Sequence, residues 1–249
     1  MKPLYTTIPV QLCEYVLLKG KVNHFALYLY LKHNSNGYID FDSSQYKYWA
    51  VDLNKSERWV RDAVKWLIKN KWITVNSKRN VLNLISYKKL CRKLRIHTTS
   101  GAIYEQEDFS DLRGFLCAVV IIYHLRKKRW MERKGWSVFK MGYAKTNHLL
   151  FPKGFHSMPI SYIAKCLKIS QSTANKFKKT AESLGYIEVK RRVTTLTDNK
   201  GNKLSKDLLH IVREANPEFG GRLRVGKKYL KLVESDIIKP EVKLKRKRL

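Results

Sequence analysis

The sequence predicts a mostly helical α+β protein in which one unit, made of a helix, a tight turn, a helix and a strand, occurs twice. The clearer copy spans Met158–Val189. The second helix of that copy has an apolar face, indicated by residues at helical spacing: Ala174, Phe177, Ala181 and Leu184. Ser170 is placed to cap this helix at its start, and Gly185 is placed to end it in a left-handed conformation. Tyr186–Val189 then alternates between apolar and polar residues as a strand does.

The second observation is an earlier copy of this unit, displaced by 114 residues. Ser170 falls on Ser56 (170 − 56 = 114), so the capping positions coincide. The apolar positions coincide as well: Ala164 with Ala50, Leu167 with Leu53, Ala174 with Val60, Phe177 with Ala63, Ala181 with Leu67, and Ile187 with Ile73. Similarity at one fixed displacement indicates two copies of a single supersecondary unit.

The segments around the first copy complete a known order of elements. A buried helix at Phe25–Lys32 and a strand at Gly37–Phe41 precede it, and its second helix runs from about Glu57 to Lys69. Strands at Trp72–Val75 and Val81–Ser86 follow it, around a basic turn. Helix, strand, two helices and a two-stranded wing is the order of a winged helix-turn-helix domain.

The second copy has the same order with one interruption. Its first helix is predicted at Leu112–Leu125, and residues 126–153 then insert basic and aromatic side chains before the turn unit. Leu208–Val212 is predicted as the strand that returns along the wing. Such a mixture of cations and rings suits contacts with nucleic acid, and it equally suits anchoring of the insertion to its own domain.

We therefore predict two winged helix-turn-helix domains in tandem with a basic C-terminal tail. The first domain is expected at residues 1–97 and the second at 112–221, with an acidic linker at 98–111 between them. The tail, 222–249, carries 11 Lys and Arg against 3 Asp and Glu, and it is expected to be a flexible basic arm.

The net charge points to a polyanionic partner. Lys and Arg number 51 against 20 Asp and Glu, which gives a net charge of +31. Nucleic acid is the usual partner of so strong a positive field. A merely solvated lysine surface would normally carry more balancing acids, and an anionic membrane would require an amphipathic insertion helix that the sequence lacks.

Other classes of protein are disfavoured by what the sequence lacks. The longest apolar run, Phe115–Tyr123, is about half the length that spans a bilayer. The first residues lack the apolar core of a secretory signal, so a cytoplasmic location is expected. The four cysteines, Cys13, Cys91, Cys117 and Cys166, have no spacing typical of metal ligands, and no metal or cofactor is expected.

The sequence supports binding rather than catalysis. Gly221, Gly226 and Lys227 match part of a phosphate-binding loop, but Lys228 stands where a Ser or Thr would hold magnesium. His210 and Arg213, with Tyr229, match part of a recombinase site. The first two are three apart on an expected strand and so would face opposite ways. We expect no enzymatic activity.

The candidate DNA contacts lie on the second helix of each unit and on the two wings. With Val60 and Ala174 pointing to the core, a helical wheel turns polar and cationic side chains outward at positions 114 apart. The candidates are Ser56, Arg58, Arg61, Lys65, Lys78, Arg79, Ser172, Asn175, Lys176, Lys179, Arg191, Arg192 and Lys200. Arg can bind guanine through two hydrogen bonds and Asn can do so with adenine, while Lys mostly contacts phosphates.

These features resemble tandem winged-helix DNA-binding proteins, particularly plasmid-type replication initiators and phage replisome organisers. The resemblance covers residues 8–86 and 112–213. It lies in Ile8-Pro9, in the apolar helix Phe25–Leu31, and in Leu184-Gly-Tyr-Ile187 at the end of a helix-turn-helix. It implies sequence-specific binding of double-stranded DNA in starting replication of a plasmid, phage or mobile element, by a monomer or homodimer that works with replication proteins.

Three alternatives remain open at this stage. A transcriptional regulator would use the same binding chemistry. A recombinase or nickase is the alternative among enzymes. A structural nucleic-acid scaffold protein would bind without preferring a defined sequence.

Overall fold

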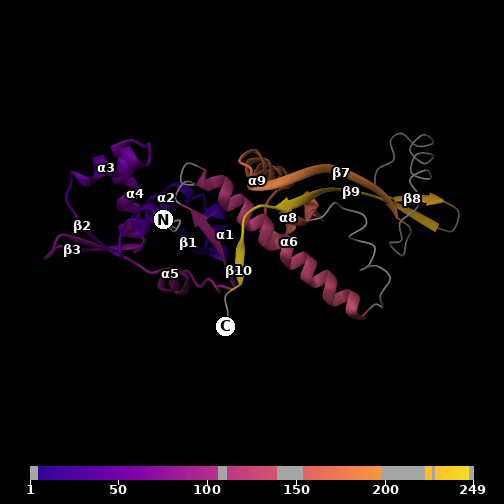
Figure 1. Ribbon diagram of the computed structural model, residues 1–249, viewed down its shortest axis with the longest axis horizontal. Coiled ribbons are helices and arrows are strands. Elements are labelled where there is room, and N and C mark those ends of the chain that lie inside the picture. The colour runs from indigo at the N-terminus through magenta and orange to yellow at the C-terminus, as the bar shows by residue number, and fades with distance from the viewer. Residues whose placement is uncertain (1–4, 106–110, 139–153, 198–221, 226–227, 247–249) are drawn as a thin grey trace. The chain divides into compact units, whose positions relative to one another are not determined.

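Helices and short antiparallel strands alternate along the chain, which is a mixed α+β protein. The computed structural model describes residues 5–105, 111–138, 154–197, 222–225 and 228–246 (Figure 1). In chain order the elements are β1 (Tyr5–Pro9), α1 (Val10–Leu18), α2 (Val22–His33), β2 (Tyr38–Asp40), α3 (Gln45–Asp52), α4 (Glu57–Lys69), β3 (Ile73–Asn76), β4 (Val81–Leu84), α5 (Tyr87–Lys93), β5 (Ser100–Glu105), α6 (Leu112–Val138), β6 (His156–Ser157), α8 (Ile160–Leu167), α9 (Gln171–Ser183), β7 (Ile187–Thr197), β8 (Arg222–Val225), β9 (Lys228–Pro240) and β10 (Leu244–Arg246).

The chain divides into two compact units whose boundaries differ from the predicted ones. One unit holds the residues up to His124, together with Phe177–Tyr186 and the chain from Glu241 onward. The other holds Leu125–Lys176 and Ile187–Pro240. Helices α6 and α9 each contribute residues to both units, so the predicted division at residues 97, 111 and 221 is not the division of the structure. A sequence pattern locates elements, whereas compact units depend on contacts between segments distant in sequence.

The core of the first repeat forms around Trp72. Helix α2 is apolar on nearly every side, and a helix of that kind must be buried. Its Phe25 and Tyr28 meet the Trp72 ring edge-on, at centroid distances of 6.2 and 5.4 Å, and Trp66 of α4 does so at 5.5 Å. The Tyr28 hydroxyl donates to the carbonyl oxygen of Ile85 at 2.6 Å, so the one polar atom of that ring has a partner.

The two helices predicted for the first repeat are present as α3 and α4. The bounds of α4 are those that the sequence predicts, Glu57–Lys69. Ser56 caps it, because its Oγ accepts the backbone N–H of Trp59 at 3.2 Å. Ser44 precedes α3 but makes no side-chain cap bond there; Asp42 instead accepts hydrogen bonds from the Ser44 backbone N–H and hydroxyl.

The 114-residue repeat recurs in the backbone hydrogen bonds. Helices α4 and α9 superimpose end to end at this displacement, since Glu57 falls on Gln171 and Lys69 on Ser183. Five N–H to carbonyl bonds of the first copy have counterparts in the second: Asn54→Val51 and Lys168→Lys165, Lys55→Ala50 and Ile169→Ala164, Val60→Ser56 and Ala174→Ser170, Lys71→Ile68 and Gly185→Glu182, Trp72→Leu67 and Tyr186→Ala181. The two segments therefore share one local structure and not only an apolar pattern.

Positive φ angles mark the same two positions in both copies. Asn54 and Lys168 lie in the turn between the helices, with φ of 50° and 54°. Lys71 and Gly185 lie after the second helix, with φ of 56° and 74°. The prediction that Gly185 ends its helix in a left-handed conformation is confirmed, and Lys71 adopts that conformation at a higher steric cost.

Each copy leads to a sheet of the same strand order. The first sheet is ordered β2-β4-β3 and the second β6-β9-β7, with β8 added beside β9. In each, the central strand, which comes last of the three in the sequence, lies between the strand before the two helices and the strand after them. In the second copy that strand is β9, which runs beside β7 (Figure 1). Its Pro240 pairs with Ile187 of β7. The segment predicted for this role, Leu208–Val212, lies outside the described residues.

The predicted acidic linker contains the central strand of a third sheet. Strand β5, Ser100–Glu105, lies between β1 and β10, with Ala102 opposite both Ile8 and Leu244. A Cβ added at Gly101 would collide with the side chain of Thr7, so β1 can approach this closely only at a glycine. The strand escapes sequence analysis because it has only three apolar residues, Ala102–Tyr104, and Ser100 and Gly101, which favour turns, precede them.

The predicted flexible arm is also structured where it is described. Strands β8, β9 and β10 all lie in residues 222–249, and both Ile237 and Ile238 are buried. Frequent Lys and Arg in this segment hide the strand alternation, because a strand exposed on one face can carry cations there. The tail is therefore part of two sheets.

The first half of the predicted insertion continues a helix. Helix α6 was expected over residues 112–125, but it extends to Val138 and so takes in residues 126–138. Its first part is buried on nearly all sides, with the Phe115 ring 4.9 Å from that of Tyr104 and 5.8 Å from that of Tyr186. The remainder of the insertion, 139–153, lies outside the described residues.

Deleting residues 243–249 is expected to destabilise the unit that contains β5. The deletion removes the buried Leu244 and the carbonyl of Lys243 that accepts the Ile103 N–H at 3.2 Å. Loss of one buried leucine side chain alone should lower the free energy of unfolding by about 1.5–3 kcal/mol. Urea unfolding of the full chain and of the deletion measures this, with deletion of 247–249 as the control. Equal stability of the two deletions would show that β10 contributes nothing to the sheet.

Candidate nucleic-acid interface

Helix α4 separates an apolar face from a cationic one. Its buried residues are Val60, Ala63, Val64 and Leu67. Arg58, Arg61 and Lys65 are exposed on the other side, as the helical wheel predicts. Three cations in two turns form a stripe that a duplex could meet in its major groove. Their orientation follows from the sequence, and their contact with DNA stays a prediction.

Arg61 is held in place by two neighbours. Its Nε and Nη2 both donate to Oε1 of Glu57, at 2.9 and 2.5 Å, and its guanidinium carbon lies 4.9 Å from the centroid of the Tyr46 ring. Partial burial raises the pKa of Tyr46, and the Arg61 charge opposes that shift. The Arg61 side chain remains half exposed. Sequence analysis missed this arrangement: the spacing of Glu57 and Arg61, four apart on a helix, signals the ion pair, but nothing local signals Tyr46 of α3.

The serines before the two helices have a structural role. Ser170 Oγ accepts the backbone N–H of Thr173 at 3.1 Å, which repeats the bond from Trp59 to Ser56. Ser56 was predicted as a DNA contact. Because its oxygen accepts the capping bond, only its hydroxyl proton is available to a phosphate.

Helix α9 presents a less charged face than α4. Ser172, Lys176 and Lys179 are exposed and Asn175 is half-buried. Ser172 Oγ lies 2.9 Å from Ser170 Oγ, so the two hydroxyls form one hydrogen-bonded pair. Lys178 is buried, with 5% of its surface exposed. Lys178 follows Ala174 by four residues, so both lie on the core side of the helix. The helical wheel therefore predicts a buried Lys178, although it was not used to do so.

Four of the five candidates predicted on the wings lie in the part of the chain that the structure describes. Lys78 and Arg79 are exposed in the turn between β3 and β4, where the Arg79 N–H donates to the Asn76 carbonyl at 3.2 Å. Arg191 and Arg192 fall at an irregularity in the pairing of β7 with β9. Lys200 lies outside the described residues.

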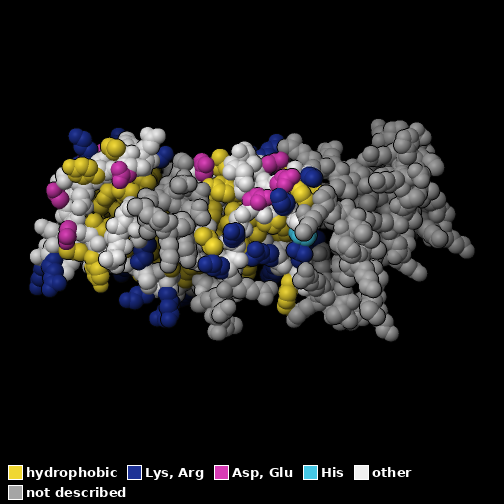
Figure 2. All heavy atoms as spheres, viewed as in Figure 1, with side chains coloured by type: hydrophobic (Ala, Val, Ile, Leu, Met, Phe, Trp, Pro, Cys, Tyr) yellow, Lys and Arg dark blue, Asp and Glu magenta, His cyan; other side chains and the backbone are white. Residues whose placement is uncertain are grey.

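Cations outnumber acids around the first repeat. Residues 1–97 contain 18 Lys and Arg against 6 Asp and Glu, a net charge of +12. Figure 2 shows dark blue Lys and Arg side chains spread over the described surface in view, with yellow hydrophobic side chains between them. Partial desolvation, and then the nearby charge of Lys71, lower the pKa of Lys93. Such crowding of like charges is relieved when an anion binds.

The chemistry available on these surfaces is hydrogen-bond donation and positive charge. In the part of the chain that the structure describes, no group of three or more His, Cys, Asp or Glu side chains is placed to hold a metal ion. None of the described helices is long and apolar enough to cross a bilayer. Comparison with protein families, with curated proteins and with solved structures finds no match to this chain.

Proposed function

We propose that this chain is a tandem winged-helix protein that binds double-stranded DNA sequence-specifically. The observation that carries the proposal is the repeat. Helices α4 and α9 have the same length, follow a turn that has a left-handed residue at the same position, and lead to sheets of the same strand order. Both have polar or cationic side chains at outward positions 114 apart. One polar helix face of this kind is common on soluble proteins. Two faces with polar or cationic side chains at matching positions support the proposal that both bind the same kind of ligand.

In the proposed complex α4 and α9 each lie in a major groove. Arg58 and Arg61 donate to guanine edges, and the amide of Asn175 pairs with adenine. Lys65, Lys78 and Lys179 neutralise phosphates and fix the register of each helix on the duplex. Glu57 and Tyr46 position Arg61 before binding, so less rotamer entropy is lost when its guanidinium meets a base.

We place this binding in the initiation of replication of a plasmid, phage or mobile element. The resemblance to replication initiators supports this role through Ile8-Pro9, which end β1 directly before α1, and through Leu184–Ile187, which follow α9. Two recognition units in one chain allow a monomer to occupy two half-sites without dimerising. A cytoplasmic location in the host follows from the proposed role.

Enrichment of bound duplexes from a random pool tests the proposal. A defined consensus should emerge. Arg61→Ala and Asn175→Ala should each relax the preference at separate positions of that consensus, by about 1–3 kcal/mol of discrimination, with little change in melting temperature. Arg113→Ala and Asn23→Ala are matched controls, since both residues are exposed and neither belongs to the candidate interface. An unchanged consensus in both test variants, or no consensus in the wild type, would refute sequence-specific binding through these helices.

A further inference from the structure

The outer face of the β2-β4-β3 sheet is polar and carries an exposed aromatic ring. Tyr38, Asn83 and Thr74 lie in one cross-strand row, and Asp40, Val81 and Asn76 lie in the next row on the same face. Tyr38 is 70% exposed, among the most exposed of the large hydrophobic side chains that the structure describes. We call this face, with the cations around it, the sheet platform.

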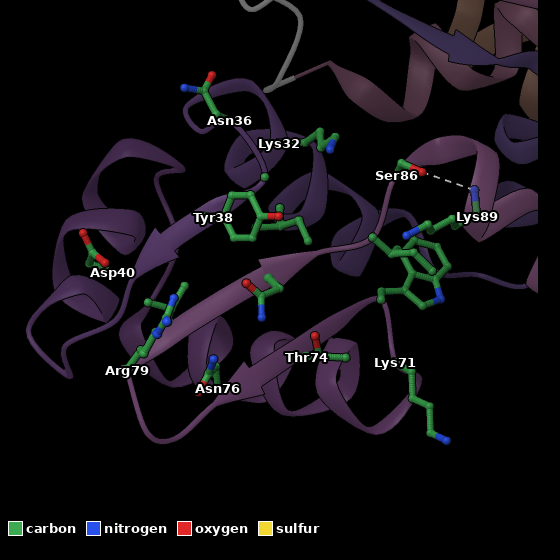
Figure 3. A pocket seen from close by; sticks show the side chains of 16 residues that line it. Lys32, Asn36, Tyr38, Asp40, Lys71, Thr74, Asn76, Arg79, Ser86 and Lys89 are labelled. Atoms are coloured by element: carbon green, nitrogen blue, oxygen red, sulfur yellow. Dashed lines mark hydrogen bonds between the residues drawn. The ribbon is translucent and has the colours of Figure 1, made fainter.

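The sheet platform is hollowed and bordered by cations. A hollow of about 820 Å³ lies over it, and its lining includes Lys32 of α2, Lys71 before β3, Arg79 of the turn and Lys89 of α5. In Figure 3 Arg79 and Asp40 lie at one end of the hollow and Lys71 and Lys89 at the other, with Tyr38 between them. The positive charges therefore come from four separate segments that fold around one ring.

The charges of the platform are not neutralised from within. Asp40 is the one acidic residue among the side chains that line the hollow, against four cations. Within the described residues, no ion pair joins any of the four cations to a carboxylate. An excess of this size over a concave surface attracts a polyanion.

The exposed ring determines which polyanion fits. In a duplex both faces of every base are already stacked, so Tyr38 would gain little from it. In a single strand the bases are free to stack, and each stacked base contributes binding on any aromatic ring whatever its identity. Thr74, Asn76 and Asn83 offer hydrogen bonds beside the ring without favouring one base.

We propose that the sheet platform binds single-stranded nucleic acid. One base stacks on Tyr38, and the phosphates on either side lie against Lys71 and Lys89 at one end and Arg79 at the other. This goes beyond the duplex-binding proposal, because no residue lining the hollow belongs to α4. Arg79 belongs both to the platform and to the candidate duplex contacts, whereas Tyr38 belongs to the platform alone, so a change at Tyr38 removes single-strand binding separately.

The test compares single strands with a duplex on the full-length protein. Fluorescence anisotropy is measured at low salt with labelled 15-nucleotide oligo(dT), oligo(U) and a 15-base-pair duplex. Tyr38→Ala should weaken binding of a single strand by about 5- to 150-fold and leave duplex affinity unchanged. Tyr38→Phe keeps the ring and should bind as the wild type does. Tyr48→Ala removes another exposed tyrosine, outside the platform, and should not weaken single-strand binding.

Each outcome decides between the two proposals. Loss of single-strand binding alone supports the platform, and the ratio of the wild-type affinities for oligo(dT) and oligo(U) tells whether DNA or RNA is preferred. Equal losses for single strand and duplex would make the platform a part of the duplex interface and overturn the inference. So would unchanged single-strand binding in Tyr38→Ala, or no single-strand binding by the wild type. Failure of the duplex proposal is seen separately, in the duplex arm with the wild type.

Discussion

Raising the salt concentration from about 50 to 200 mM should weaken duplex binding by about 10³- to 10⁵-fold. This range applies if Lys and Arg neutralise about 6–10 phosphates. Each neutralised phosphate releases condensed counterions from the DNA, and a higher salt concentration opposes that release. The net charge of +31 and the exposed cations of α4 and of the turn between β3 and β4 supply the groups for such a number. The slope of log affinity against log salt concentration, measured by anisotropy, gives the number of phosphates directly.

Two variants test which cations contribute to the salt dependence of binding. Lys65→Ala and Lys78→Ala should each make the slope shallower by about one unit while the preferred sequence stays the same. A slope near zero for the wild type would contradict the polyanion interpretation of the charge. A steep slope that neither variant changes would place the phosphate contacts elsewhere on the chain.

Trp72→Ala should cost about 3–5 kcal/mol of unfolding free energy. The Trp72 side chain is 1% exposed and its ring meets those of Phe25, Tyr28 and Trp66. Removing it leaves a cavity, and the rings that line this cavity lose their contacts with Trp72. The cavity cannot close unless α2 or α4 moves. Duplex binding through α4 should fall in parallel, because α4 rests on this core.

Trp130→Ala is the control for loss of a tryptophan. Its side chain is 49% exposed on α6, so the change should cost far less than that of Trp72. Chemical denaturation with intrinsic fluorescence and circular dichroism measures both variants. Equal stability losses in the two would mean that Trp72 is not the centre of the core that its ring contacts indicate.

Local features of the repeat could be predicted from the sequence. The cap at Ser56, the bounds of α4 and the left-handed Gly185 are all present in the structure. Each depends on residues within a few positions of one another, so the pattern that determines them is contiguous. The outward direction of Arg58 follows in the same way, from the 3.6-residue period of the helix.

Features that depend on distant segments could not be predicted. Strand β5 lies between β1 and β10, which pair with it on either side, and its own three apolar residues are too few to predict a strand. Arg61 is oriented by Tyr46 of another helix, and Tyr38 becomes the centre of the sheet platform only when α2, α5 and two turns surround it. Such contacts join residues that are distant in the sequence, so a short stretch of sequence does not reveal them. The outward direction of the α4 candidates could therefore be predicted, and the side chains that surround them could not.

The pairing of β10 with β5 also constrains the order in which the protein can assemble. Leu244 follows its partner Ala102 by 142 residues (244 − 102). At about 5–20 residues per second, synthesis leaves that edge of β5 without β10 for about 7–28 s after β5 is made. Throughout that interval β5 presents free backbone groups that another nascent chain could pair with. Folding beside the ribosome therefore includes a period of vulnerability to aggregation, which a chaperone that covers strand edges would shorten.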